Sequence, residues 1–111
     1  MKRIETNNFI LTQSIVEANG DSTWIVKKKS NSRIFYIHVF NTNYLNIKFF
    51  DGVKDASEAI TALCNNIVEE TGRIPCINIY CTNEALIITC KRAGFRKVKN
   101  VKQLYKFRIR S

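Results

Sequence analysis

Four cysteines and a single histidine are the residues of this sequence that could hold a metal ion or form disulfides. The cysteines are Cys64, Cys76, Cys81 and Cys90, and His38 lies well before them. No Cys-x-x-Cys pair is present, and the odd spacing of Cys76 and Cys81 would turn their side chains to opposite faces of one strand. Neither a zinc site, nor any other metal site, nor a disulfide framework is therefore expected. We predict small, buried, free cysteines in the reducing cytoplasm.

Basic side chains are concentrated at the end of the chain. The net charge is +9, and residues 91–110 hold nine lysines and arginines without an acid, whereas the first 90 residues carry nine charges of each sign. Such a one-sided field favours an anionic partner: nucleic acid, a phosphate-bearing cofactor or an acidic protein. A solvated basic face that only keeps the protein soluble explains the same pattern.

Three aromatic residues alternate with these cations: Phe95, Tyr105 and Phe107. In a nucleic-acid complex they could stack on bases while the cations contact phosphates. In a strand they would instead be the half of the alternation that faces the core. No recognised nucleic-acid motif decides between the two.

Length and composition indicate one globular domain, residues 1–111. Apolar residues make up 45% of the chain and charged residues 24%, which suits a packed core and argues against disorder. No apolar run approaches the roughly 18–20 residues that cross a bilayer. The start, "MKRIETNNFILTQS", lacks the apolar core and cleavage site of a signal peptide. We expect an intracellular protein with no membrane partner.

The first half of the sequence alternates in the manner of β-strands. "STWIVKKK" places Trp24 and Val26 on one face and Ile25 on the other. Residues 33–40, "RIFYIHVF", are apolar enough to be buried on both faces. The polar "KKKSNSR" between them predicts a hairpin turn, and residues 44–50, "YLNIKFF", predict the next strand.

The periodicity becomes helical after this point. Apolar residues at positions 56, 60, 63, 64, 67 and 68 form one stripe of a helix. Asp55 followed by Glu58 resembles a capping box, and Gly72 suits the C-terminal end of the helix. The following "RIPCINIYCT" predicts a strand with Pro75 at its beginning.

A second helix and a final pair of strands complete the predicted elements. Thr82 or Asn83 can cap a helix that runs to about Ala93 and is ended by Gly94. Since this helix is apolar on nearly every side, we expect it to be well covered. "FRKVKNVKQLYKFRI" predicts two strands around a turn near Asn100. The order of elements indicates an α/β (α+β) fold, with a mixed sheet and helices on its faces.

The segment "INIYCTNEALIITCKRAGFRKVK" resembles the C-terminal half of the GNAT superfamily of N-acetyltransferases. In that family a strand leads to an asparagine, a helix follows, and a Gly-Phe pair comes eleven and twelve residues after the asparagine. Asn83, Gly94 and Phe95 have this spacing. The resemblance covers roughly residues 45–109 and implies a GNAT-like, mostly antiparallel mixed sheet flanked by two main helices.

The resemblance also implies a function, the transfer of an acetyl group from acetyl-CoA to an amine. In the family, two adjacent parallel strands splay apart and the pantetheine arm enters the cleft between them. The pyrophosphate of CoA sits on backbone N–H groups at a helix N-terminus. By correspondence, Gly52 and Lys54 lie in the pyrophosphate loop, and Tyr80, Asn83 and Phe95 are cofactor contacts beside the cleft.

The sequence departs from the family pattern at three places. The loop "FFDGVKDASEAI" lacks the usual second glycine, and its Asp51 and Asp55 would repel phosphate. Cys90 stands seven residues after Asn83, where the family often has a general-acid tyrosine; a thiol can donate a proton, but a cysteine in an apolar helix commonly only fills space. No carboxylate lies on the central strands, so His38 is the candidate general base.

Whether the chain is an enzyme is therefore left open. One hypothesis is an N-acetyltransferase with a degenerate active site. The other is a non-catalytic GNAT-like module whose basic face, residues 91–110, binds an acidic protein or nucleic acid. The Asn-, Lys- and Ile-rich composition is typical of an AT-rich genome, such as that of a bacteriophage or mobile element. Exposed strand edges would suit a homodimer.

Overall fold

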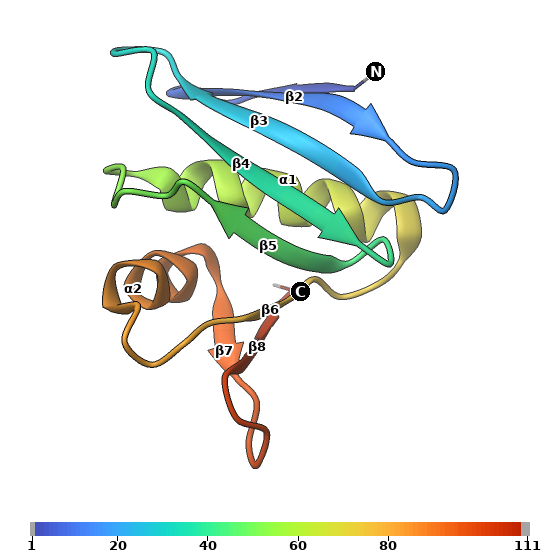
Figure 1. Cartoon of the computed structure of the whole chain (residues 1–111), viewed down its shortest axis with the longest axis vertical. Helices are drawn as coiled ribbons and strands as arrows, with labels where there is room; N and C mark the ends of the chain where they lie inside the picture. Colours follow the sequence, from blue (N-terminus) through green and yellow to red (C-terminus); the bar gives the residue numbers. More distant parts are fainter. Residues whose placement is uncertain (1, 110–111) are drawn as a thin grey trace.

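The computed structural model describes residues 2–109 as a mixed α+β fold with one eight-stranded sheet and two helices (Figure 1). The strands lie in the order β1-β2-β3-β4-β5-β6-β8-β7, and β5 and β6 are parallel while the other neighbours are antiparallel. The bounds of the strands are β1 (Arg3–Glu5), β2 (Phe9–Val16), β3 (Ser22–Lys28), β4 (Ile34–Phe40), β5 (Tyr44–Lys48), β6 (Cys76–Asn78), β7 (Phe95–Lys97) and β8 (Leu104–Phe107). Helix α1 (Ala56–Thr71) joins β5 to β6, and α2 (Glu84–Ala93) joins β6 to β7.

The predicted hairpins of the first half are confirmed, with one correction. Lys28 and Ile34 bound the polar turn between β3 and β4, and Trp24 and Val26 are buried on the same face of β3. Strand β4, however, is buried on one face only, because its side chains alternate between buried and partly exposed. The expectation of burial on both faces is wrong, since no helix covers the second face.

Helix α1 follows the predicted stripe but not the predicted cap. Gly72 ends the helix at a φ of 70°, and its N–H donates to Val68 O. Asp55 also adopts a left-handed conformation, and its side chain makes no capping hydrogen bond. The capping box is therefore wrong. Glu58 instead reaches the turn between β1 and β2, where it accepts hydrogen bonds from the Thr6 hydroxyl and from two N–H groups of Asn8.

Helix α2 has the predicted ends but less cover than expected. The Asn83 side chain accepts from Leu86 N at 3.4 Å, and Gly94 ends the helix at a φ of 116°. One face, with Leu86 and Cys90, is buried, but Ile88 is 52% exposed. The expectation that α2 is covered on nearly every side is wrong, because α2 lies at the border of the core and packs against α1 and the last strands.

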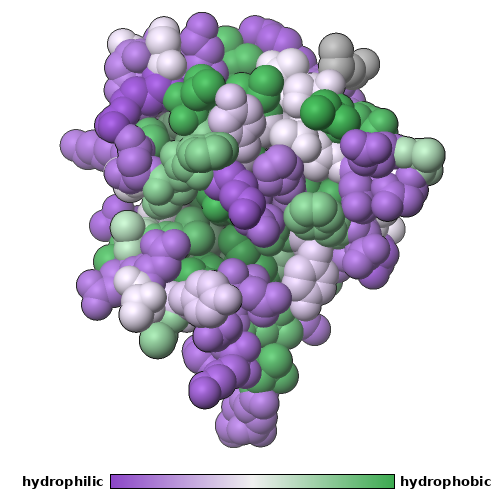
Figure 2. All heavy atoms as spheres, in the orientation of Figure 1, coloured by the Kyte–Doolittle hydropathy of each residue, from purple (hydrophilic) through white to green (hydrophobic). Residues whose placement is uncertain are grey.

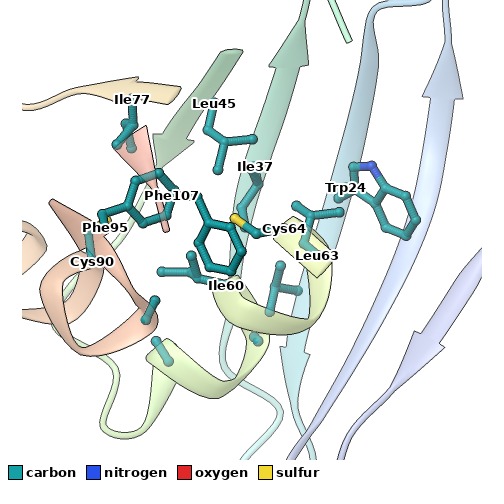
Figure 3. Packing of buried hydrophobic residues seen from close by; sticks show 14 of the residues in the cluster. Trp24, Ile37, Leu45, Ile60, Leu63, Cys64, Ile77, Cys90, Phe95 and Phe107 are labelled. Carbon is teal, nitrogen blue, oxygen red and sulfur yellow. The ribbon is translucent and has the colours of Figure 1, made fainter. Parts of the chain in front are cut away.

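Both helices lie on the same face of the sheet, which corrects the expectation of helices on both faces. The Thr61 hydroxyl of α1 donates to Ala93 O of α2 at 3.0 Å. Side chains from both helices and from seven strands form one apolar cluster; its labelled members in Figure 3 include Trp24, Ile37, Leu45, Ile60, Leu63, Cys90, Phe95 and Phe107. In Figure 1, α1 lies behind β2–β5. The face turned away from the helices is here named the outer face.

The outer face carries the alternate residues of the strands. Strand registers place Ile25 beside Tyr36 and Tyr36 beside Lys48, and likewise His38 beside Asn46. These side chains are partly or largely exposed, and none belongs to the core cluster. The view from this side shows apolar and polar side chains mixed over the strands (Figure 2). The outer face is therefore an uncovered, chemically mixed surface.

Glu58 gives a prediction on stability. Hydrogen bonds, above all that from Thr6, hold the pKa of Glu58 below its ordinary value of 4.5. The charged form therefore stabilises the fold above that pH, and the contribution is lost as pH falls through the lower folded-state pKa. We expect Glu58→Gln to lower the free energy of unfolding at pH 7 by about 1 kcal/mol. Urea unfolding from pH 7 to 3 should show this deficit narrowing below about pH 4.5.

Glu69→Gln is the matched control, since Glu69 lies on the same helix, is exposed and makes no side-chain hydrogen bond within residues 2–109. It should change stability little at any pH. A Glu58→Gln deficit that stays constant down to pH 3 would contradict the assigned role of the carboxylate.

Candidate functional site

The candidate site is a cleft between the parallel strands β5 and β6. Only two residue pairs join these strands, Tyr44 with Cys76 and Leu45 with Ile77. Beyond them a cleft of about 500 Å³ opens. Its lining residues come from β5 with the preceding turn, from the end of β6 and from the start of α2: Phe40, Asn41, Tyr44, Leu45, Asn46, Ile47, Lys48, Ile77, Asn78, Ile79, Tyr80, Asn83 and Leu86.

The two strands separate because each follows a different neighbour. Strand β5 stays paired with β4 as far as Lys48. The chain after β6 instead follows β8, since Ile79 N donates to Gln103 O at 2.9 Å. Within the predicted strand over residues 73–82, only the three residues of β6 form a strand. The divergence leaves part of the β5 edge without a strand partner.

That free edge carries backbone hydrogen-bonding groups. Asn43 O accepts from Cys76 N at 2.8 Å, so the backbone of residue 43 faces β6. Because successive residues of a strand turn their backbone groups to alternate sides, residues 45 and 47 face the same way. Leu45 is paired with β6, whereas Ile47 lies past the last pair. The N–H and C=O of Ile47 are thus aimed into the cleft.

The walls of the cleft combine apolar and polar side chains, and Lys48 is the one charged residue among the lining residues within residues 2–109. Leu45, Ile77 and Ile79 are buried and form an apolar floor. Asn46 and Asn78 add amides, and Tyr44 and Tyr80 add hydroxyls. No carboxylate lines the cleft within residues 2–109. Such a site suits an extended, uncharged ligand with amide groups better than a metal ion or a sugar phosphate.

The residues proposed from the sequence are only partly brought together here. Tyr80 and Asn83 line the cleft, and Asn83 is held in place because its side chain caps α2. Gly52, Lys54 and Phe95 are not among the lining residues. Phe95 is fully buried, with its ring edge-on to Phe107 at a centroid distance of 5.6 Å.

The loop before α1 is acidic around its glycine. Gly52 adopts a φ of 80° with open space where a Cβ would be, so the turn uses its conformational freedom without a close neighbour. Asp51 is ion-paired with Arg33. Asp55 precedes the helix and Glu58 is in its first turn. The negative charges of these three acids cancel the positive end of the helix dipole and would repel a second anion. This helix start is therefore a poor site for pyrophosphate.

His38 lies on the outer face next to the cleft. Its Nδ1 is 3.0 Å from the Thr23 hydroxyl, its ring stacks on Phe40, and its cross-strand neighbour Asn46 lines the cleft. Since Thr23 engages Nδ1, Nε2 is the nitrogen left for a substrate proton. This placement keeps the general-base hypothesis for His38 open.

Cys90 lies in the core and not in the cleft. It is fully buried near Cys64 of α1, and burial raises the pKa of its thiol to about 12. A thiol in this position would need a rearrangement to reach a ligand. Its role as general acid stays an untested prediction.

The other cysteines divide into two kinds. All four are free. Cys64 and Cys76 are buried as predicted, but Cys81 is exposed because it follows β6 in a turn. Over the described part of the chain, no three His, Cys, Asp or Glu side chains are grouped so that they could hold a metal ion. Nor is either helix long and apolar enough to cross a membrane.

The structure corrects one of the two expectations for the aromatic residues of the basic C-terminal segment. Phe95, Tyr105 and Phe107 are 0%, 5% and 6% exposed and point into the core. They cannot stack on bases, so the nucleic-acid hypothesis built on these three rings is wrong. The neighbouring cations remain exposed, among them Lys97, Lys102 and Lys106.

Of the residues that line the cleft, only Tyr80 and Asn83 were proposed from the sequence; the missed ones include Tyr44, Asn46, Lys48 and Asn78. The sequence held a signal for the residues on β5, because the resemblance to the GNAT superfamily implies that residues 44–50 form one of the two strands that splay apart. No protein-family model, curated protein or solved structure matches the chain.

Native-state thiol labelling tests the placement of Cys90. Because its thiol is buried and its pKa is about 12, we expect dithionitrobenzoate at pH 8 to react rapidly with Cys81 and with no other cysteine. Cys81→Ser should abolish the fast phase, and Cys90→Ser should leave it unchanged. Fast labelling of Cys90, identified by peptide mapping, would show that the thiol reaches solvent and would favour its catalytic role.

Proposed function

We propose that the chain is a GNAT-like domain whose cleft binds the pantetheine arm of a CoA thioester and transfers the acyl group to an amine. The observation that carries the proposal is the separation of two parallel strands with a free backbone edge at Ile47. A pantetheine arm contains two amides and is extended, so it can pair with this edge as an added strand would.

The order of elements supports the same proposal. The cleft is formed by β5 and β6, which run parallel and are joined by the crossover helix α1. Asn83 caps α2, the helix that follows β6 in the sequence. These are the features on which the resemblance to the family rests. The chain departs from the family at the pyrophosphate loop, where acids surround the helix start. We therefore propose that the arm, rather than the nucleotide, supplies most of the binding energy.

Acyl transfer requires two proton movements. The amine nitrogen attacks the thioester carbon, the C–S bond breaks, the nitrogen loses a proton and the leaving thiolate gains one. His38 Nε2 is the proposed acceptor of the first proton. The hydroxyl of Tyr44 or Tyr80 is the proposed donor of the second, since both line the cleft. Cys90 has no step in this proposal.

Calorimetric titration with acetyl-CoA and acetyl-pantetheine tests the binding step. Because the start of α1 offers no anion site, we expect the two Kd values to lie within about threefold, equal to roughly 0.7 kcal/mol. Asn78→Trp should fill the cleft and weaken both by about tenfold or more. Asn65→Trp is the matched control, since Asn65 is equally exposed but lies on α1. Absence of binding to both ligands would overturn the proposal.

Release of free CoA in the presence of simple amines, such as butylamine and a short unblocked peptide, tests the chemical step. We expect His38→Gln to lower kcat by roughly a hundredfold with little change in KM. Cys90→Ala should leave kcat near the wild-type value. Binding without release from any amine would favour a non-catalytic module, and an unchanged His38→Gln rate would remove His38 from the mechanism.

A further inference from the structure

The outer face carries a row of aromatic side chains that the acyl-transfer proposal uses only in part. Tyr36, His38 and Phe40 alternate along β4, and Tyr44 lies directly across from Phe40 on β5. Successive members on β4 are about 7 Å apart, as the pleat requires. Phe40 is 42% exposed, and none of the four belongs to the core cluster.

One further ring extends this row. Phe49 follows β5 with a φ of 61° and is 79% exposed. Its ring packs edge-on against Tyr36 at a centroid distance of 5.7 Å. An exposed phenylalanine in a left-handed conformation gains little by burial within the chain. The aromatic row therefore offers ring faces and edges to something outside the chain.

Cations surround the aromatic row on the same face. Lys48 lies beside Tyr36 by strand register. From Tyr44 the register continues through Cys76 to Lys106 on β8, and from there to Arg96 on β7. Lys27 stands on β3 and is exposed. One line of residues across four strands thus leads from the aromatic row to the basic end of the sheet.

Within residues 2–109 these cations have no ion-pair partner. The ion pairs over residues 2–109 use the basic residues Lys2, Arg3, Lys29 and Arg33. Among outward-facing strand residues the one acid is Glu5, at the far end of the sheet, and Lys29 and Arg3 lower its pKa. The outer face is therefore positively charged, and no acidic side chain on strands β3–β8 balances this charge.

We propose that the outer face binds single-stranded nucleic acid, with bases stacked on the row Tyr36–His38–Phe40–Tyr44 and phosphates held by Lys48 and Lys106. Exposed rings next to uncompensated cations match a ligand that alternates flat bases with negative charge. A duplex keeps its bases stacked inside and uses only the cations. An acidic protein also uses the cations and leaves the aromatic row unexplained.

This binding mode requires no acyl transfer, but the two proposed sites overlap. His38 and Tyr44 have a role in both, and Phe40 and Lys48 also line the cleft. It also uses rings that are partly or largely exposed in place of Phe95, Tyr105 and Phe107, which are buried. The basic C-terminal strands keep a role, because Lys106 and Arg96 face outward beside the aromatic row. Arg96 is partly committed, since its Nη1 donates to Phe95 O at 2.8 Å. Lys48 and Lys106 are therefore the residues to test.

Fluorescence anisotropy with a labelled thymidine dodecamer, single-stranded or annealed to its complement, tests the proposal in the full chain. The single strand should bind at least tenfold more tightly than the duplex at moderate salt. The double variant Lys48→Gln/Lys106→Gln should weaken single-strand binding about tenfold. It should also reduce the slope of log K against log salt by about 1.4, because each phosphate contact contributes roughly 0.7.

Lys91→Gln/Arg92→Gln is the matched control. It removes the same charge from the end of α2, which covers the opposite face of the sheet. It should change affinity less than about twofold at moderate salt, where distant charges are screened. Equal losses in the two double variants would overturn the proposal, because the chain would then act only as a diffuse polycation.

Stacking is tested at Phe40. Phe40→Leu keeps an apolar side chain on a partly exposed site but removes the ring, and should weaken binding about tenfold. Phe40→Trp should restore or improve it. If Phe40→Leu binds as the wild type does, or if polyglutamate displaces the dodecamer as well as unlabelled single strand does, the face is an electrostatic site for acidic partners and the proposal fails. Thermal melts of each variant confirm that it is folded.

Discussion

The apolar stripe of α1 packed against one face of the sheet is the interaction on which the rest of the structure depends. Ile60 and Leu63 are fully buried in it, and the same cluster reaches α2 and the last strands. Burying side chains of this size contributes about 1.5–3 kcal/mol each, so this layer holds most of the favourable energy. Within residues 2–109, two helices pack against a sheet of eight strands, and both lie on the same side of it.

The cleft is a consequence of that arrangement. Helix α1 crosses over the sheet, so β6 runs parallel to β5. The chain after β6, however, continues its hydrogen bonding with β8. A parallel pair held at one end and drawn apart at the other leaves backbone donors and acceptors unpaired. Backbone groups of this kind need a hydrogen-bond partner, and here they face a cleft with an apolar floor. A ligand that can act as a strand therefore suits this part of the fold.

The uncovered face has a different origin. On β3 and β4, buried residues alternate with outward-facing ones. On β4 the outward-facing residues include Tyr36, His38 and Phe40, whereas those on β7 and β8 include Arg96 and Lys106. The pairing of the strands aligns the two groups on one surface. The proposed acyl-transfer cleft and the proposed nucleic-acid surface therefore overlap, since Phe40, Tyr44 and Lys48 line the cleft and also belong to the outer face.

The sequence by itself determined the elements whose signals are local. The hairpin before β4, the stripe of α1, the cap at Asn83 and the glycine ends at Gly72 and Gly94 all depend on neighbours within a few residues. Tertiary structure alone decided what depends on distant partners. Glu58 hydrogen-bonds to Thr6 and Asn8 instead of forming the expected cap, and the chain after β6 follows β8 rather than β5. Which sheet face stayed open could not be read from alternation, since alternation gives two faces and only the placement of the helices chooses between them.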